Sequence, residues 1–182
     1  KSTNRRVTST SKIIIRKIKV YCNELLGEKK EMAELKKVNF IVVHHSVTGI
    51  NTTFEQIRQM HLDKGWSDIG YHKVIDYNGN VLQGRKDSVI GAQAFGLNQE
   101  SLGILCIGNF EEILPSDKQY QALITVCATL LKRYKLPIEK LIGHKEVAKL
   151  INDPSAATAC PGKNLSISEL RKKVKPYLKG GK

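Results

Sequence analysis

Three side chains of the types that bind transition metals stand far apart in the sequence, where predicted strands or turns end: His44, His144 and Cys160. Neutral imidazole and cysteine thiolate are the ordinary protein ligands of zinc. Their spacing matches no compact zinc-binding motif, so spacing alone supports a shared site only weakly. Three protein ligands would leave one tetrahedral position for water, whose pKa a catalytic zinc ion lowers to about 7. These residue types therefore suggest hydrolytic chemistry.

Residues 41–49 (IVVHHSVTG) form an apolar, β-branched run that ends in two adjacent histidines. Successive side chains of a strand point to opposite faces, so His44 and His45 cannot both reach one metal if the strand runs regularly. One of them is a candidate ligand and the other a core or supporting residue, and the local sequence does not decide between them. His61, within a helical pattern, is interpreted as structural.

Strand-like and helical patterns alternate around these residues. Strands are predicted over residues 39–44, 71–76, 81–83, 102–107 and 141–142, with a hairpin turn at 77–80. Helices are predicted over residues 54–64, 116–134, 147–151 and 166–178, the first capped by Thr52 or Thr53 and the second by Ser116. Residues 102–107 form a continuous apolar run, expected at the centre of the sheet. The pattern predicts an α/β fold, a mixed central β-sheet flanked by helices.

The first 37 residues have a different character. Residues 1–11 are polar, basic and without periodicity, which is typical of disorder. Apolar residues at 14, 18, 21 and 25 then predict a basic amphipathic helix ending near Gly27, with a strand over 13–20 as the competing interpretation. Helical pattern resumes over 28–35. We therefore divide the chain into a basic, partly helical N-terminal extension, residues 1–37, and a main domain, residues 38–182.

The net charge of +13 is concentrated at the two ends. Residues 1–37 carry 11 basic and 4 acidic residues, a net +7, and residues 163–182 carry 7 and 1, a net +6, so the middle is neutral. Basic ends suit attraction to a polyanion such as nucleic acid, an anionic membrane or an anionic cell wall, with solubility as the alternative explanation. No apolar run approaches the roughly 18 residues of a membrane span.

The four cysteines are widely spaced and include no CxxC pair: Cys22, Cys106, Cys127 and Cys160. This is not a disulfide framework, and it favours synthesis in a reducing cytoplasm. Cys106 and Cys127 lie in apolar patterns and are interpreted as small buried hydrophobic residues. Cys160 lies in a polar loop (TACPGK), where packing does not explain it.

Six motifs occur in order: VHHSVT, GWSDIGYHKVID, GNVLQGR, VIGAQAFGLNQESLGI, LIGHKEV and ACPGK. Together they resemble the zinc-dependent N-acetylmuramoyl-L-alanine amidases of the type 2 family, which includes phage lysozyme-type amidases and peptidoglycan recognition proteins. The resemblance covers roughly residues 38–164. It implies that His44, the first of the histidine pair, binds zinc together with His144 and Cys160.

The resemblance also implies roles beside the metal. Tyr71, in DIGYH, would donate a hydrogen bond to the substrate carbonyl or its oxyanion, which stabilises developing negative charge. Thr158, two residues before Cys160, would hydrogen-bond the oxyanion or position the water. No carboxylate is clearly placed as a general base; Glu146 could serve only if its loop allowed it.

A further set of residues would line the substrate groove. The family often has histidine where this chain has Gln93, which forms hydrogen bonds but does not titrate near neutral pH, so substrate positioning there is open. Gly96, Asn98 and Ser101 resemble a groove-lining loop. Trp66, the only tryptophan, either contributes to the groove or packs as a hydrophobic plug.

The expected function is hydrolysis of the amide bond between N-acetylmuramic acid and L-alanine in peptidoglycan by zinc-activated water. The partners would be peptidoglycan or muropeptide, with anionic wall polymers at the basic ends. The enzyme would act at the bacterial cell wall, secreted or released by lysis. One alternative is a non-catalytic peptidoglycan-binding module. Another is a nucleic-acid or partner-protein binder, which the neutral middle and the 6% aromatic content disfavour.

Overall fold

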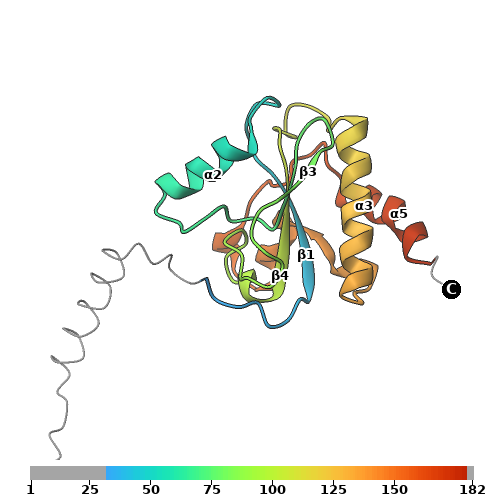
Figure 1. Ribbon diagram of the computed structural model, residues 1–182. Helices are drawn as coiled ribbons and strands as arrows, with labels where there is room; N and C mark the ends of the chain where they lie inside the picture. Colours follow the sequence, from blue (N-terminus) through green and yellow to red (C-terminus); the bar gives the residue numbers. More distant parts are fainter. Residues whose placement is uncertain (1–31, 180–182) are drawn as a thin grey trace, which may run out of the picture. The chain divides into compact units, whose positions relative to one another are not determined.

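The computed structural model describes residues 32–179, and five strands form one mixed sheet at its centre (Figure 1). The strands are β1 (Phe40–His45), β2 (Lys73–Ile75), β3 (Val81–Gln83), β4 (Ser101–Cys106) and β5 (Leu141–Gly143). Their order is β3-β2-β4-β1-β5, with β3 antiparallel to β2 and every other pairing parallel. The predicted mixed sheet and its central strand are confirmed, whereas the strand predicted over 71–76 is limited to β2.

Four helices are described: α2 (Phe54–Asp63), α3 (Asp117–Arg133), α4 (Val147–Leu150) and α5 (Ile167–Leu178). Side-chain caps start the three longer ones, because a hydroxyl at the N-cap accepts a backbone N–H that the first turn leaves unpaired. Thr53 accepts from the Gln56 N–H and Ser116 from the Gln119 N–H, as the sequence predicted. Within the described part of the chain, no helix is long and apolar enough to cross a membrane.

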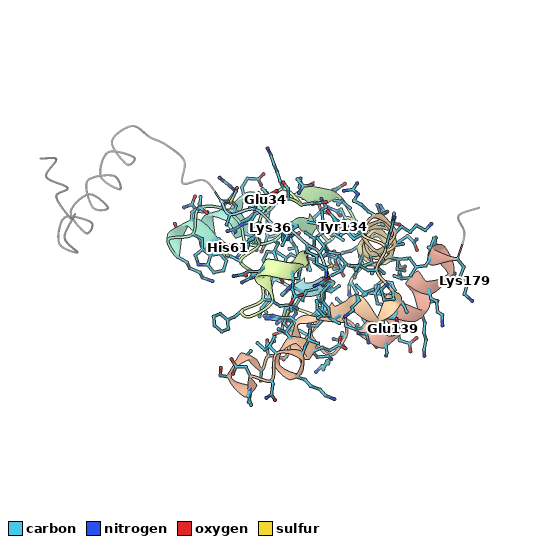
Figure 2. All side chains as sticks on the ribbon, turned by 90° about the horizontal axis from the view of Figure 1, so that it is seen from below. Glu34, Lys36, His61, Tyr134, Glu139 and Lys179 are labelled. Carbon is cyan, nitrogen blue, oxygen red and sulfur yellow. The ribbon has the colours of Figure 1, made fainter. Side chains whose placement is uncertain are left out.

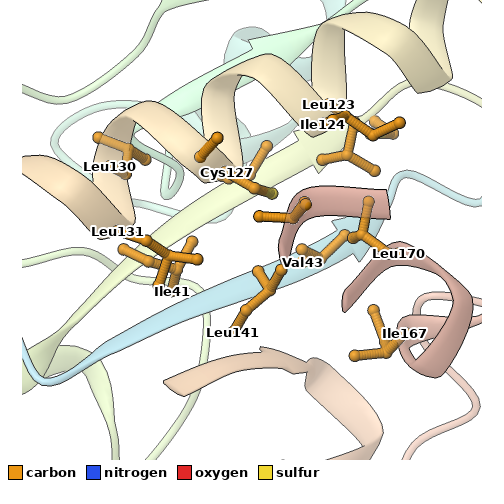
Figure 3. Close-up of a cluster of buried hydrophobic side chains, with 14 of the residues drawn as sticks. Ile41, Val43, Leu123, Ile124, Cys127, Leu130, Leu131, Leu141, Ile167 and Leu170 are labelled. Carbon is orange, nitrogen blue, oxygen red and sulfur yellow. The ribbon is translucent and has the colours of Figure 1, made fainter. Parts of the chain in front are cut away.

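One side of the sheet, which we call the helical face, is covered by α3 and α5 (Figures 1 and 3). Alternate residues of the strands point to it, including Ile41 and Val43 of β1. They pack with α3 and α5 side chains such as Leu131 and Leu170 in one large buried apolar cluster. This cluster is the main core of the domain.

The other side, which we call the loop face, is covered by the loops before β2 and before β4 and by the short helices α2 and α4. Figures 1 and 2 place α2, which carries His61, away from α3 and α5. Two smaller apolar clusters lie here. One contains Val42, Leu97 and Val147, and the other contains Ile57 and Leu105. His44 of β1 and Ser101 and Gly103 of β4 point to the same face.

Residues 32–35 are not helical, which corrects that part of the predicted helix over 28–35. Glu34 forms an antiparallel bridge to Val89, and the Leu35 N–H donates to the Ser88 carbonyl at 2.8 Å. Leu35 is buried in the main core. Pairing with a neighbouring segment has overridden the local helical pattern here. The predicted disorder over 1–11 and the predicted helix before Gly27 lie outside the described residues.

Candidate metal centre

The two adjacent histidines at the end of β1 point to opposite faces of the sheet. His44 lies on the loop face and is 1% exposed. His45 lies on the helical face, where its Nδ1 accepts the Phe110 N–H at 3.0 Å and its ring lies 6.0 Å from that of Phe110. Strand alternation therefore separates a histidine with a structural hydrogen bond from one that faces the candidate site.

Side chains of His44, His144 and Cys160 converge on the loop face. One ligand atom of each lies within 4.8 Å of the others, and His44 Nδ1 is 3.7 Å from Cys160 Sγ. His44 ends β1 and His144 follows β5, its parallel neighbour, so the carboxyl ends of two adjacent strands bring the imidazoles together. A backbone hydrogen bond holds the loop that carries Cys160 next to His144: the N–H of the following residue, Lys145, donates to the Cys160 carbonyl at 2.7 Å.

Burial sets the protonation of these three groups. The pKa of His44 lies well below its ordinary value because the ring is buried and because His144 is adjacent. Burial also lowers the pKa of His144. Both imidazoles are therefore neutral at neutral pH, with lone pairs available for a cation. Burial raises the pKa of the Cys160 thiol to about 11, although the His45 N–H, 3.4 Å from the sulfur, acts in the opposite direction.

The donor set fits a zinc ion. Zinc–sulfur and zinc–nitrogen bonds of about 2.3 and 2.0–2.1 Å in tetrahedral geometry place N and S about 3.6 Å apart, close to the observed 3.7 Å. Two imidazole nitrogens and one sulfur make three ligands, and no carboxylate joins this group among the described residues. The arrangement corresponds to an open, three-ligand metal centre.

Tyr71 lies beside this centre, its ring 5.1 Å from that of His44 in an edge-on arrangement. Burial raises the pKa of its phenol far above the ordinary value, and Cys160 adds to the effect. The hydroxyl therefore stays protonated and able to donate a hydrogen bond. A row of rings supports it: His61 lies 5.6 Å from Tyr71 and 4.6 Å from Trp66, which is 37% exposed.

The structure gives His61 a positioning contact that the sequence interpretation missed. Its Nδ1 accepts the Gly70 N–H at 3.0 Å, directly before Tyr71. The same segment is held from another side by the buried Arg85, which donates to the carbonyls of Ile69 and Ile90, each at 2.7 Å. An apolar helix pattern in the sequence conceals such a contact, because the partner is a backbone group nine residues away.

The loop residues predicted to bind substrate differ in where they point. Gln93 is buried, and its amide contacts His44 and Ser101 rather than open surface. The Asn98 Oδ1 accepts the N–H groups of both Gln93 and Ala94, at 2.8 and 2.9 Å, and so holds the loop. Gly96 has a positive φ of 77°.

Two further candidates have local hydrogen bonds. The Thr158 Oγ1 accepts the Cys160 N–H at 3.2 Å, which fixes the turn that presents the sulfur. Glu146 accepts the Gly143 N–H at 2.7 Å with one carboxylate oxygen and bonds Arg171 at 2.9 Å with the other. Both oxygens are occupied by structural partners, so Glu146 is not placed as a general base.

Comparison with known proteins identifies the family. Residues 34–163 match the family described as N-acetylmuramoyl-L-alanine amidase, a span that includes the three converging residues. The chain belongs to this amidase family. The predicted resemblance is thereby confirmed.

The relatives that resemble this chain include peptidoglycan-recognition proteins and phage endolysins. A peptidoglycan-recognition protein from Drosophila simulans is 33% identical over 143 residues, 74% of each chain. The endolysin of Escherichia phage T7 is 33% identical over 125 residues, 65% of this chain and 82% of its own. Among solved structures, the N-acetylmuramoyl-L-alanine amidase LysC from Clostridium intestinale URNW superposes with a TM-score of 0.72 at 32% identity, covering 81% of this chain and 91% of its own.

Proposed function

We propose that this protein is a zinc-dependent peptidoglycan amidase that hydrolyses the bond between the lactyl group of N-acetylmuramic acid and the L-alanine of the stem peptide. The observation that carries the proposal is the convergence of His44, His144 and Cys160, with Tyr71 beside them, in a chain of the amidase family. The family supports the bond that is cleaved, and the three-ligand donor set supports the use of zinc.

His44, His144 and Cys160 would hold the metal. When bound, zinc supplies a water of lowered pKa and a Lewis acid for the amide carbonyl. The chain itself provides neutral imidazoles, because burial keeps protons off both rings. It also provides a sulfur in a turn that the hydrogen bond of Thr158 to the Cys160 N–H stabilises.

Tyr71 would donate its phenolic proton in a hydrogen bond to the carbonyl oxygen of the scissile amide. Its raised pKa keeps that proton in place, and the His61 ring lies beside the phenol ring. A donor held before the reaction stabilises the oxyanion without reorganisation. Thr158 would assist through its hydroxyl proton, since its oxygen already accepts the Cys160 N–H.

The catalytic domain would comprise residues 38–182. In it, Trp66 and the loop of Gly96 and Asn98 would form the exposed part of the substrate groove. The basic ends would add long-range attraction to anionic wall polymers. Such an enzyme would act at the bacterial cell wall after secretion or release by lysis.

Digestion of purified peptidoglycan followed by mass spectrometry of the fragments tests the proposal. We expect stem peptides with a free L-alanine amino group and glycan strands with free lactyl carboxylates. Chelator should prevent their release, and added zinc should restore it. Fragments cut within the glycan strand or within the stem peptide would refute the proposed bond.

A non-catalytic peptidoglycan-binding module is the second candidate, because peptidoglycan-recognition proteins are among the relatives. The three metal-ligand types in one cluster favour the enzyme. Binding of muropeptide by the zinc-loaded chain, with every fragment recovered intact, would decide for the binding module.

A further inference from the structure

The amide of Gln93 lies behind the metal centre, on the side of His44 away from Cys160. Its Oε1 is 2.5 Å from His44 Nε2, and its Nε2 donates to Ser101 Oγ at 2.8 Å. The Ser101 hydroxyl in turn donates to the Leu97 carbonyl at 2.7 Å. Four groups thus form one buried chain of hydrogen bonds from a loop carbonyl to a candidate metal ligand.

The Leu97 carbonyl determines which groups donate and which accept in this series of hydrogen bonds. A carbonyl only accepts, so the single proton of Ser101 is committed to Leu97 and the Ser101 oxygen must accept from the amide. The NH₂ group of Gln93 therefore faces Ser101, and its carbonyl oxygen faces His44. That oxygen requires a donor, so the proton of the neutral imidazole lies on Nε2 and the lone pair lies on Nδ1.

We propose that Gln93 is a positioning residue that holds His44 in the Nε2-protonated tautomer, with Nδ1 free for the metal. The atom left free is the one 3.7 Å from Cys160 Sγ. Hydrogen bonds to the second nitrogen of a metal-bound histidine orient its ring and increase its basicity. This inference adds a residue to the proposed metal centre and rests on that part of the proposed function.

Gly103 leaves the space that the Gln93 side chain occupies beside β4. A Cβ at Gly103 of β4 would lie 2.6 Å from Gln93 Cγ and 2.8 Å from its Cδ, so a larger residue would displace the side chain. The backbone of the loop is fixed as well, because Asn98 accepts the Gln93 N–H at 2.8 Å. A glutamine side chain does not ionise, so its carbonyl oxygen is a hydrogen-bond acceptor at any pH.

Nitrogen-15 NMR of the metal-free full chain tests the tautomer directly, through long-range couplings between ring protons and ring nitrogens. We expect His44 to be Nε2-protonated alone. Gln93→Met keeps the length of the side chain and removes the acceptor, and it should give a mixture of tautomers. Zinc affinity, measured by competition with a chromogenic chelator, should fall by about 10–100-fold.

Gln119→Met is the matched control, because Gln119 is also a fully buried glutamine, on the helical face, where its Nε2 donates to the carbonyls of Ile75 and Ile107. It should lower stability but leave the His44 tautomer and zinc affinity unchanged. If Gln93→Met does not fold, Ser101→Ala releases the amide to rotate and should give the same mixture.

His44 protonated on Nδ1 in the unaltered chain would overturn the inference. So would an unchanged tautomer and unchanged zinc affinity in folded Gln93→Met or Ser101→Ala protein. Neither readout involves substrate. A chain with the expected tautomer and tight zinc binding that cleaves no peptidoglycan would refute the proposed function and leave this inference intact.

Discussion

The helical face and the loop face are built from alternate residues of the same strands, yet they bury different kinds of side chain. The helical face buries one large apolar cluster beneath α3 and α5, together with two hydrogen-bonded polar residues, His45 and Gln119. The loop face buries two smaller apolar clusters and a larger set of hydrogen-bonded polar residues, which includes His44, His72, Gln93 and Ser101. A mostly apolar face on one side of the sheet is thus backed by a face with more buried polar groups on the other.

The difference separates stability from chemistry. Apolar burial is non-directional and contributes in proportion to area, so the helical face, with the larger apolar cluster, contributes most to the stability of the domain. Buried polar groups need partners of defined geometry, so the loop face sets where protons and lone pairs point. Substitutions on the two faces should therefore affect different measurements.

The largest effect is expected from Cys160→Ser, which replaces the only sulfur of the metal centre. Loss of a residue that only hydrogen-bonds a metal ligand lowers metal affinity by at most roughly 100-fold. Loss of the ligand itself should lower zinc affinity by more than that, and peptidoglycan hydrolysis should stop. Chelator competition and fragment release measure the two effects. Cys127→Ala, a buried cysteine of the helical face, is the control and should keep zinc and activity. Full zinc affinity in Cys160→Ser would contradict the assignment.

Leu131→Ala tests the helical face. Leu131 is fully buried in the main core, and removing it leaves a cavity. The free energy of unfolding should fall by about 2–5 kcal/mol in urea denaturation of the full chain. Zinc affinity of the folded protein should not change. A weakened metal site without loss of stability would show that the two faces are not separable in this way.

Tyr71→Phe removes one hydrogen-bond donor beside the metal centre and keeps the ring. We expect kcat for peptidoglycan hydrolysis to fall by about 10²–10³-fold, as for other oxyanion donors. Zinc affinity and unfolding free energy should remain within error. Since the ring contacts with His44 and His61 persist, a large loss of stability would mean that the hydroxyl has a structural role.

The smallest effect concerns pH. His72 is fully buried, its Nε2 donates to the Val89 carbonyl and its Nδ1 accepts the Gly103 N–H, and burial lowers its pKa. Below about pH 6.5 the unfolded chain binds a proton at this residue that the folded chain does not, so stability falls as pH falls.

His72→Gln should therefore reduce the slope of unfolding free energy against pH, by at most about 1.4 kcal/mol per pH unit. Urea denaturation between pH 5 and 7 measures that slope. An identical slope in the variant would mean that His72 titrates alike in both states.

Much of the helical face could be predicted from the sequence, because apolar periodicity and hydroxyl caps are local signals. Ser116 caps α3 as expected, and Thr53, one of the two candidates that the sequence offered, caps α2 on the other face. The structure of residues 33–35 could not be predicted in this way, because their pairing with residues 88–90 is a contact between distant segments.

The candidate site was predictable only in part. Strand alternation indicated that one histidine of the pair faces the site, and the family resemblance selected His44. The hydrogen bonds of Gln93 and Ser101 could not be predicted, because in the sequence both are ordinary polar residues of a glycine-rich loop. Their burial depends on Gly103 of β4, whose missing side chain makes room for the amide.

The X-ray absorption spectrum of zinc bound to the full chain reports directly on whether His44, His144 and Cys160 hold the metal. We expect one sulfur at about 2.3 Å and three nitrogen or oxygen atoms at about 2.0–2.1 Å from the zinc, one of them from exchangeable water. Two or more sulfur ligands, a fourth ligand from the protein, or the absence of stoichiometric zinc binding would contradict that expectation.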